Sequence, residues 1–273
     1  INFDSYFAMI EPASAIRDVA AAQSWHITQA LKASKHARLP LLSAAAPFKM
    51  GGHGRPNYFT DVRKGTIAMR NVADLYLFPN TICALRISGA ALINWLEYSA
   101  GIFCQLTTMA TGQRLLESGF APYNFDTISG LTYQIDLSQP ARFSTHGHLQ
   151  AAHAQRIRNL LYRGEEVTAD MEFLVATNSY RAGQGGNFPG ADEGELVFAG
   201  TETHQEILRA YFENTSSGRV LPHPSWSFAP IPGAAAVFET SSRASQSAQR
   251  LADLNIEVIG ESHGGWQTFR KHF

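Results

Sequence analysis

The stretch at residues 75–100 reads LYLFPNTICALRISGAALINWLEYSA. Its first part predicts two strands, 75–80 and 81–87, because apolar residues flank the turn signal Pro79-Asn80. Ser88 then predicts the start of a helix that runs through residue 100, since serine is a favoured N-cap residue. One face of that helix carries Leu92, Trp95, Leu96 and Ser99. The stretch therefore indicates a chain that mixes strands with helices.

On the N-terminal side, three- and four-residue steps predict an amphipathic helix over Ile16–Leu31. The residues on its shared face are Ile16, Val19, Gln23, Ile27 and Ala30. The next segment, 35–63, contains three prolines and three glycines around the apolar piece Leu39–Ala46. That composition predicts mostly loop, with room for a ligand contact.

On the C-terminal side, alternating apolar and polar residues predict a half-buried strand over 131–137. Arg163-Gly164 marks the turn of a hairpin within 156–167, and 172–177 predicts a further strand. This strand leads into the glycine-rich loop 183–190. The alternation at 131–137 indicates a sheet with one covered face.

The last third of the chain contains one clear helix signal. Thr203 and Glu206 have the spacing of a capping box, which predicts a helix through Phe212. Late strands are predicted at 234–238 and 254–259, after a proline-rich segment.

Composition narrows the class of function. The chain has 273 residues, 45% of them hydrophobic, and 22 Lys plus Arg against 23 Asp plus Glu, for a net charge of −1. It is therefore expected to be globular, and the neutral balance argues against a nucleic-acid polymer as partner. No apolar run is long enough to predict a membrane span, so no membrane partner is expected. The start at Ile1 is expected to be a cut inside a longer precursor.

Two short motifs suggest catalysis or metal binding. Gly260-Glu-Ser262-His-Gly264 matches the nucleophile elbow G-x-S-x-G after an apolar strand, but no acidic residue follows it. His146, His148 and His153 could ligate a transition metal, although their polar surroundings also fit a solvated loop. Two cysteines, Cys83 and Cys104, are too few for a disulfide framework or a cysteine metal cluster, and we expect packed or free thiols.

Aromatic residues beside amides provide a third set of candidates. Phe78 precedes Pro79-Asn80, Tyr180 precedes Arg181 and the glycine-rich loop, and Tyr123 opens the run YNFD. Two rings can stack on one base while an amide binds a ribose hydroxyl, and glycines allow close approach of the backbone. Aromatic residues at strand ends are, however, more often core or rim packing than ligand platforms, so composition alone leaves both interpretations open.

Several blocks of sequence resemble the C-terminal domain of the 5'-nucleotidase superfamily, most closely its bacterial periplasmic branch of 2',3'-cyclic-nucleotide 2'-phosphodiesterase/3'-nucleotidases. The blocks are Ser43–Lys49 (SAAAPFK), Ala73–Asn80 (ADLYLFPN), Ser88-Gly89 with Trp95–Glu97 (WLE), Tyr123–Asp126 (YNFD), Tyr133–Asp136 (YQID) and Ala176–Ala182 (ATNSYRA). The resemblance implies an α+β fold of two packed mixed or antiparallel sheets flanked by helices, over residues 1–273.

The resemblance also implies a substrate site. Phe78 and Tyr180 match the two rings that sandwich the base, and Asn80 matches the asparagine that contacts the ribose. Asn187 falls near the position that contacts the base edge, offset by one inserted residue. The remaining substrate-binding candidates are Tyr123 and Lys49, and Lys49 stands where 5'-nucleotidases proper have an arginine.

In this family, the resemblance implies, hydrolysis takes place in an N-terminal metallophosphoesterase domain with two divalent metal ions, which this chain lacks. The chain is therefore expected to carry no catalytic residue and no cofactor, to bind a nucleoside or nucleotide, and to be covalently linked to the metal-binding domain in a periplasmic precursor. By itself it should be inactive. The alternative is a stand-alone ligand-binding or interaction protein that has kept the fold without the nucleotide specificity.

Overall fold

The computed structural model describes residues 3–50, 55–62, 68–215 and 221–273. The α-helices of this part are α1 (Ser14–Ala30), α2 (Met69–Leu75), α3 (Gly89–Ser99), α4 (Ser179–Ala182), α5 (His204–Thr215) and α6 (Ala248–Asp253). The strands are β1 (Phe3–Asp4), β2 (Leu41–Ala45), β3 (Asp61–Val62), β4 (Thr81–Ser88), β5 (Gln113–Arg114), β6 (Thr127–Ser129), β7 (Leu131–Ile135), β8 (Ile157–Tyr162), β9 (Glu165–Glu166), β10 (Glu172–Asn178), β11 (Glu195–Thr203), β12 (Trp226–Phe228), β13 (Ala235–Ser241), β14 (Ile256–His263) and β15 (Trp266–His272).

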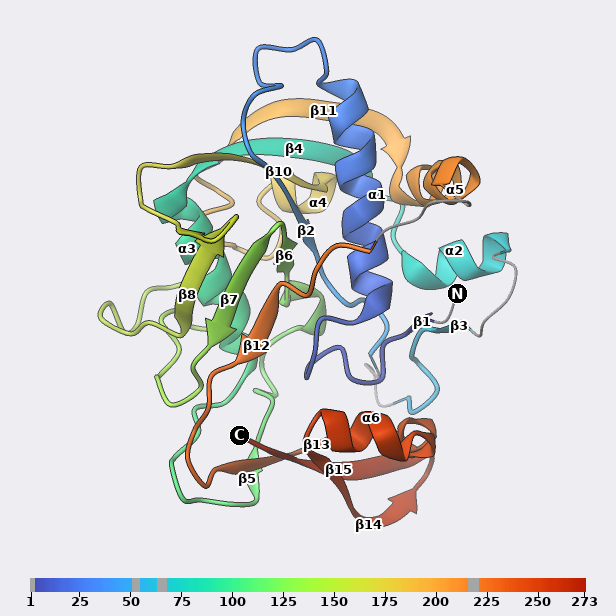
Figure 1. Cartoon of the computed structure of the whole chain (residues 1–273), viewed down its shortest axis with the longest axis vertical. Helices are drawn as coiled ribbons and strands as arrows, with labels where there is room; N and C mark the ends of the chain where they lie inside the picture. Colours follow the sequence, from blue (N-terminus) through green and yellow to red (C-terminus); the bar gives the residue numbers. More distant parts are fainter. Residues whose placement is uncertain (1–2, 51–54, 63–67, 216–220) are drawn as a thin grey trace.

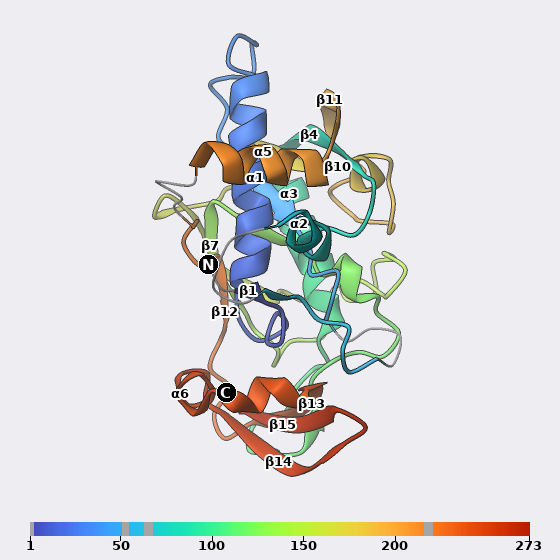
Figure 2. The same ribbon diagram turned by 90° about the vertical axis from the view of Figure 1, so that its right-hand side faces the viewer.

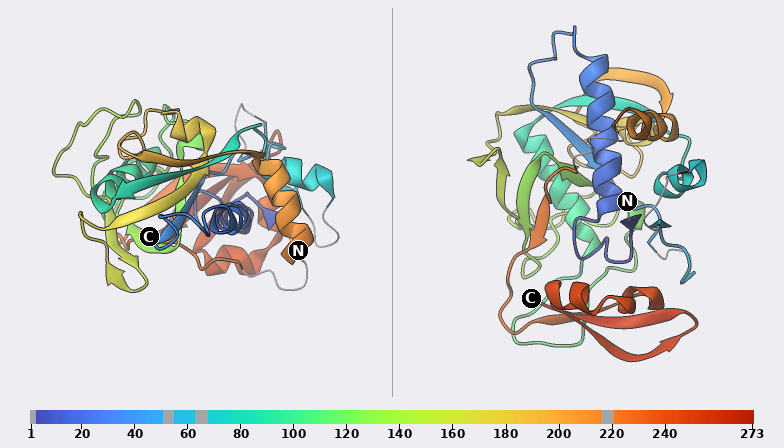
Figure 3. Two further views of the ribbon diagram at one scale, coloured as in Figure 1. Left: turned by 90° about the horizontal axis from the view of Figure 1, so that it is seen from above. Right: turned by 45° about the vertical axis from the view of Figure 1, so that its right-hand side comes forward.

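A five-stranded sheet in the order β11-β4-β10-β2-β6 separates two hydrophobic cores (Figure 1). Successive residues of β10 point to opposite faces of this sheet, as the two-residue period of a strand requires. Leu174 and Ala176 pack in the core formed with α1, α2 and α5, whereas Phe173 and Val175 pack in the core that contains α3. Viewed from above, α1 is seen end-on with α5 beside it (Figure 3). Helices thus cover both faces of the sheet.

Two four-stranded sheets complete the architecture of the described residues. The order β12-β7-β8-β9 forms one, packed in the same core as α3, and the order β14-β15-β13-β5 forms the other. The latter lies with α6 at one end of the molecule, away from α5 and β11 (Figures 1 and 2). Each of the three large sheets contains one parallel pair among antiparallel ones. β1 and β3 form a separate antiparallel pair.

Arg250 of α6 joins the end sheet to the N-terminal segment. Its guanidinium donates hydrogen bonds to both Asp4 oxygens, at 2.8 and 2.7 Å, and to Glu11 Oε1. The same group lies 5.0 Å from the centre of the Phe7 ring. These contacts attach the last third of the chain to its first ten or so residues.

The predicted α+β class, with mixed and antiparallel sheets flanked by helices, is confirmed. The helix predicted at 16–31 is α1, and the strand at 81–87 is β4. Ser88 caps α3, because its Oγ accepts a hydrogen bond from the Ala91 N–H at 3.1 Å. The hairpin at 156–167 is formed by β8 and β9.

The capping box and the late strands are confirmed as well. The Thr203 N–H donates to Glu206 Oε2 at 2.8 Å, and the Glu206 N–H donates back to Thr203 Oγ1 at 3.3 Å. The predicted strands at 234–238 and 254–259 correspond to β13 and β14. Cys83 and Cys104 are free thiols.

The strand predicted at 75–80 is wrong. Leu75 is the last residue of α2, and the residues up to Asn80 form no strand. Two of their carbonyls accept hydrogen bonds from the start of α5 instead of from a neighbouring strand: Tyr76 from Gln205 Nε2 at 2.9 Å, and Asn80 from the His204 N–H at 3.2 Å. Sequence reasoning also missed α2, α6, β11, β12 and β15, and the end sheet adds a third large sheet to the two expected. None of the helices in the described ranges combines the length and apolar composition of a membrane span.

Candidate functional site

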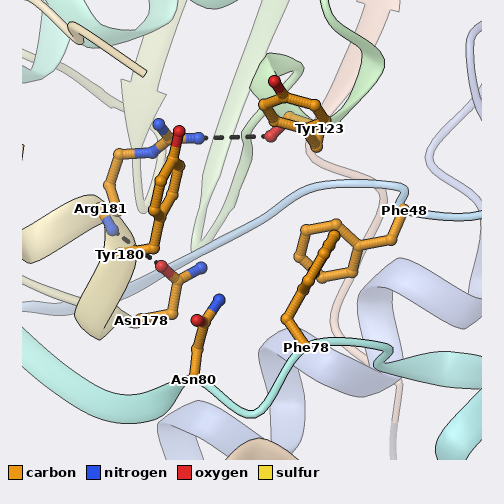
Figure 4. Close-up of a pocket in the computed structure, with 7 residues that line it drawn as sticks. All are labelled: Phe48, Phe78, Asn80, Tyr123, Asn178, Tyr180 and Arg181. Atoms are coloured by element: carbon orange, nitrogen blue, oxygen red, sulfur yellow. Dashed lines mark hydrogen bonds between the residues drawn. The ribbon is translucent and has the colours of Figure 1, made fainter. Parts of the chain in front are cut away.

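A cavity of about 290 Å³ opens beside the ends of β4 and β10 (Figure 4). Its lining residues come from four separate segments of the chain: Phe48, Phe78, Asn80, Tyr123, Asn178, Tyr180 and Arg181. Rings and amides make up this set, apart from one arginine. The arrangement is typical of a site for a flat organic ligand.

The register of the sheet explains why distant segments meet here. β4 and β10 are antiparallel, and Ile82 pairs with Asn178. The residues just before β4 and those just after β10 must therefore lie at the same end of the sheet. The Thr81 N–H, which donates to Ser179 Oγ at 3.2 Å, extends this connection beyond the ladder. Phe78 and Tyr180 are brought to one cavity in this way.

The rings of Phe78 and Tyr180 lie on opposite sides of the cavity (Figure 4). Both are large aromatic side chains left exposed, at 42% for Phe78 and 46% for Tyr180. Phe48 packs edge-on against Phe78, with ring centres 5.2 Å apart and an interplanar angle of 85°. Phe48 in turn packs edge-on against the buried Tyr76, at 4.8 Å. The Phe78 side of the cavity is therefore supported by a row of rings.

Hydrogen bonds hold the side chain of Asn178 and the backbone of Asn80, the two asparagines of the cavity. Asn178 caps α4, because its Oδ1 accepts a hydrogen bond from the Arg181 N–H at 2.8 Å. The Asn80 carbonyl accepts from the His204 N–H at 3.2 Å and from His204 Nδ1 at 2.9 Å. A carbonyl can only accept, so Nδ1 of His204 carries the proton. The backbone of Asn80 is thereby held in place from α5.

His204 is held neutral by its surroundings. Its ring stacks on that of Tyr76, with centres 4.2 Å apart and an interplanar angle of 9°. Burial lowers the pKa of His204 to about 4, since the charged imidazolium would lose its hydration there. The nearby His26 lowers the same pKa further, and the hydrogen bond to Asn80 acts in the opposite direction.

Among the described residues that line the cavity, Arg181 alone is charged, and its charge is compensated. Its Nε and Nη2 donate to the two oxygens of Asp126 at 2.8 and 3.2 Å. Nη2 also donates to the Tyr123 carbonyl at 3.3 Å, and Nη1 donates to the Gly185 carbonyl. The guanidinium covers the Phe188 ring, 3.5 Å from its centre. The cavity therefore presents aromatic and amide groups without a net charge.

Four of the six predicted substrate-binding residues line this cavity: Phe78, Asn80, Tyr123 and Tyr180. Lys49 does not; its Nζ forms an ion pair with Asp74 at 2.6 Å. Asn187 is exposed and lies beside Gly147, outside the cavity lining. The structure thus brings together the ring and amide candidates and places the candidates for the phosphate and the base edge elsewhere.

Sequence reasoning missed three lining residues, Phe48, Asn178 and Arg181. All three lie inside blocks that carry the family resemblance, SAAAPFK and ATNSYRA. Composition gave no signal for them, because a ring, an amide or an arginine beside a loop is common on any protein surface.

The two other sequence motifs do not form sites in the described residues. Ser262 lies in β14, which leads into a hairpin with β15 and not into the helix that a nucleophile elbow requires. Its Oγ donates to the Trp266 carbonyl at 3.0 Å. His146, His148 and His153 are exposed, and no group of three or more potential metal ligands is found within the described ranges.

A protein-family model matches more than half of the chain. The family model described as "5'-nucleotidase, C-terminal domain" matches residues 19–193. Those residues include the cavity-lining segments and most of the five-stranded sheet.

Curated relatives match nearly the whole chain. A trifunctional nucleotide phosphoesterase protein of Bacillus subtilis is 36% identical, with 100% of this chain and 19% of the relative covered. A 2',3'-cyclic-nucleotide 2'-phosphodiesterase/3'-nucleotidase of Haemophilus influenzae is 40% identical over 98% of this chain and 43% of the relative. A protein of the same name from Salmonella typhimurium is 39% identical over 88% of this chain and 39% of the relative. The chain thus spans less than half the length of each.

Solved structures show the same fold at low identity. A putative 5'-nucleotidase from Staphylococcus aureus superposes with a TM-score of 0.62 at 20% identity, over 82% of this chain and 38% of that one. A 5'-nucleotidase precursor from Thermus thermophilus superposes with a TM-score of 0.58 at 15% identity, over 82% of this chain and 36% of that one.

Proposed function

This chain belongs to the 5'-nucleotidase C-terminal domain family, and on that premise we propose that it is the substrate-recognition part of a 2',3'-cyclic-nucleotide 2'-phosphodiesterase/3'-nucleotidase. The base of the nucleotide is held between Phe78 and Tyr180. Relatives that carry this name match 88% and 98% of the chain. Membership of the family would also fit other nucleotide phosphoesterases. The 39–40% identity to relatives of this name favours a 2',3'-cyclic-nucleotide 2'-phosphodiesterase/3'-nucleotidase.

The observation that carries the proposal is the pair of exposed rings on opposite sides of one cavity, Phe78 and Tyr180 (Figure 4). A purine or pyrimidine offers two π-faces, and stacking on one aromatic side chain contributes about 1–3 kcal/mol. Asn80 and Asn178 add neutral donors and acceptors at the same cavity. They suit ribose hydroxyls and base edges.

The neutrality of the cavity suggests which part of the nucleotide it takes. Arg181 is paired with Asp126, and Lys49 with Asp74, so neither of these two cations is offered freely to a phosphate at the cavity. The nucleoside portion would enter, while the phosphoester stays outside it. We place hydrolysis and its two divalent metal ions in an N-terminal part of the protein outside this chain, and the whole protein in the periplasm.

The test is calorimetric titration of the chain with adenosine, without metal. The wild type should bind, and Phe78→Ala and Tyr180→Ala should each weaken binding about 5- to 150-fold, the equivalent of one lost stacking face. Met109→Ala is a matched control, because Met109 is 81% exposed and does not line the cavity. Equal binding by all four proteins, or no binding by the wild type, would contradict the proposal and favour a ligand-binding protein without nucleotide specificity.

A further inference from the structure

Gly185 stands in the glycine-rich loop at a position where the backbone itself does not require glycine. Its neighbour Gly186 has a φ of +84°, which disfavours any side chain. Gly185 has no such positive φ. A glycine in an ordinary conformation indicates that another group comes too close for a Cβ atom.

That group is Tyr180. A Cβ at position 185 would lie 2.6 Å from both Cδ2 and Cε2 of the Tyr180 ring and 2.5 Å from the Tyr180 carbonyl oxygen. Gly185 is not among the residues that line the cavity, so it contacts the ring from outside. One part of the half-exposed ring is therefore in contact with backbone, and another faces the cavity.

The backbone of Gly185 is itself held firmly. Its N–H donates to the Tyr180 carbonyl at 2.8 Å, and its carbonyl accepts a hydrogen bond from Arg181 Nη1. Arg181 is in turn bound to Asp126 and to the Tyr123 carbonyl across the cavity. The surface against which the ring rests is thus connected to the neighbouring wall of the site.

From these contacts we infer that Gly185 is a positioning residue for nucleoside binding, because it holds the Tyr180 ring where it can stack on a base. This inference rests on the proposed function of the cavity. A methyl group at position 185 would collide with both the ring and the backbone carbonyl of Tyr180, so this residue could not keep its place at the cavity wall. Affinity for a flat ring should then fall although no residue that touches the ligand has changed.

The test is a double-mutant cycle with adenosine as the probe, measured by calorimetry on the purified chain. Gly185→Ala should weaken binding by about fivefold or more, a large part of the effect of deleting the ring. In the Tyr180→Ala background, the same change should have a clearly smaller effect, because the clash with the ring is gone and only the close approach to the backbone carbonyl of residue 180 remains. Gly183→Ala is the control for a methyl group added elsewhere in the loop, since a Cβ there meets two carbonyl oxygens, at 3.1 and 3.7 Å, but no ring atom.

A second readout separates ring position from general loss of folding. In the wild type, the H2 and H8 signals of bound adenosine should shift upfield because of the ring currents, and in Gly185→Ala this shift should shrink at saturating ligand. Wild-type affinity and a wild-type chemical shift in Gly185→Ala would overturn this inference but not the proposed function. The same holds if Gly185→Ala lowers the affinity equally in the wild type and in Tyr180→Ala. Absence of adenosine binding by the wild type would overturn it together with the proposed function.

Discussion

Arg181 and Asp126 form an ion pair in which both side chains are almost fully buried, at 3% and 6% exposed, with the shorter N–O distance 2.8 Å. Asp126 also accepts a hydrogen bond from Trp95 Nε1 of α3 at 2.9 Å. Through Arg181 the pair reaches the carbonyls of Tyr123 and Gly185. Two walls of the cavity are therefore attached to one buried charge pair and, through it, to the core.

Loss of one charge of this pair should destabilise the fold strongly. Asp126→Asn keeps the shape but leaves the Arg181 guanidinium buried without its counter-charge, which typically costs about 3–5 kcal/mol. The measurement is the free energy of unfolding from a urea titration. Glu257→Gln serves as the control, because the Glu257–Arg270 pair is solvent-exposed and should contribute much less. Similar losses of unfolding free energy in the two variants would contradict this prediction, because the buried pair would then stabilise the fold no more than the exposed one.

His204 should make stability fall in mild acid. Its pKa in the folded chain is about 4, against an ordinary value of 6.5. Above pH 6.5 the His204 imidazole is neutral in both the folded and the unfolded state. As the pH falls from 6.5 towards 4, the imidazole takes up a proton in the unfolded state but stays neutral in the folded state, which lowers the free energy of unfolding. The loss over that range should be about 3 kcal/mol.

Unfolding in urea at pH 7, 6 and 5 measures this dependence. His204→Gln should flatten it, whereas the change His146→Gln, at an exposed histidine, should leave it as in the wild type. An unchanged slope in His204→Gln would assign the dependence to another group and contradict this prediction.

Phosphate should add little to the affinity of this chain for a nucleoside. Lys49 is held by Asp74 at 2.6 Å and does not line the cavity. We therefore expect 3'-AMP and adenosine to bind with affinities within about threefold of each other, and Lys49→Met to change neither, because a lysine already paired offers little to a second anion. Calorimetry with both ligands decides this point. A fall confined to 3'-AMP in Lys49→Met would instead establish the phosphate contact.

Local rules of sequence predicted the elements that depend on local contacts. The capped starts of α3 and α5 follow from Ser88 and from the Thr203–Glu206 pair, whose hydrogen bonds span three residues. The strand prediction at 75–80 was wrong for a long-range reason, because the hydrogen-bond partners of that segment lie on α5, more than a hundred residues later. The edge strand β11, in which no residue is buried, also gave no clear pattern of alternation.

The site shows the same division. Composition alone could not predict that Phe78 and Tyr180 line one cavity. The family resemblance predicted it, and the register of β4 and β10 explains how the two residues meet. Arg181 was missed because its partner Asp126 lies 55 residues away, so that the sequence shows a loop arginine and not a buried ion pair. Lys49 and Asn187 were chosen by their place in the family pattern, and their roles stay predictions.

The most direct measurement of the central claim is a nuclear Overhauser experiment on the chain with bound adenosine, with the Phe and Tyr rings isotopically labelled. Transfer from the adenine H2 and H8 protons to both Phe78 and Tyr180 is the expected result, assigned by loss of one set of peaks in Phe78→Leu and of the other in Tyr180→Leu. Transfer to only one of these rings, or to neither while adenosine is bound, would contradict the sandwich and with it the proposed mode of recognition.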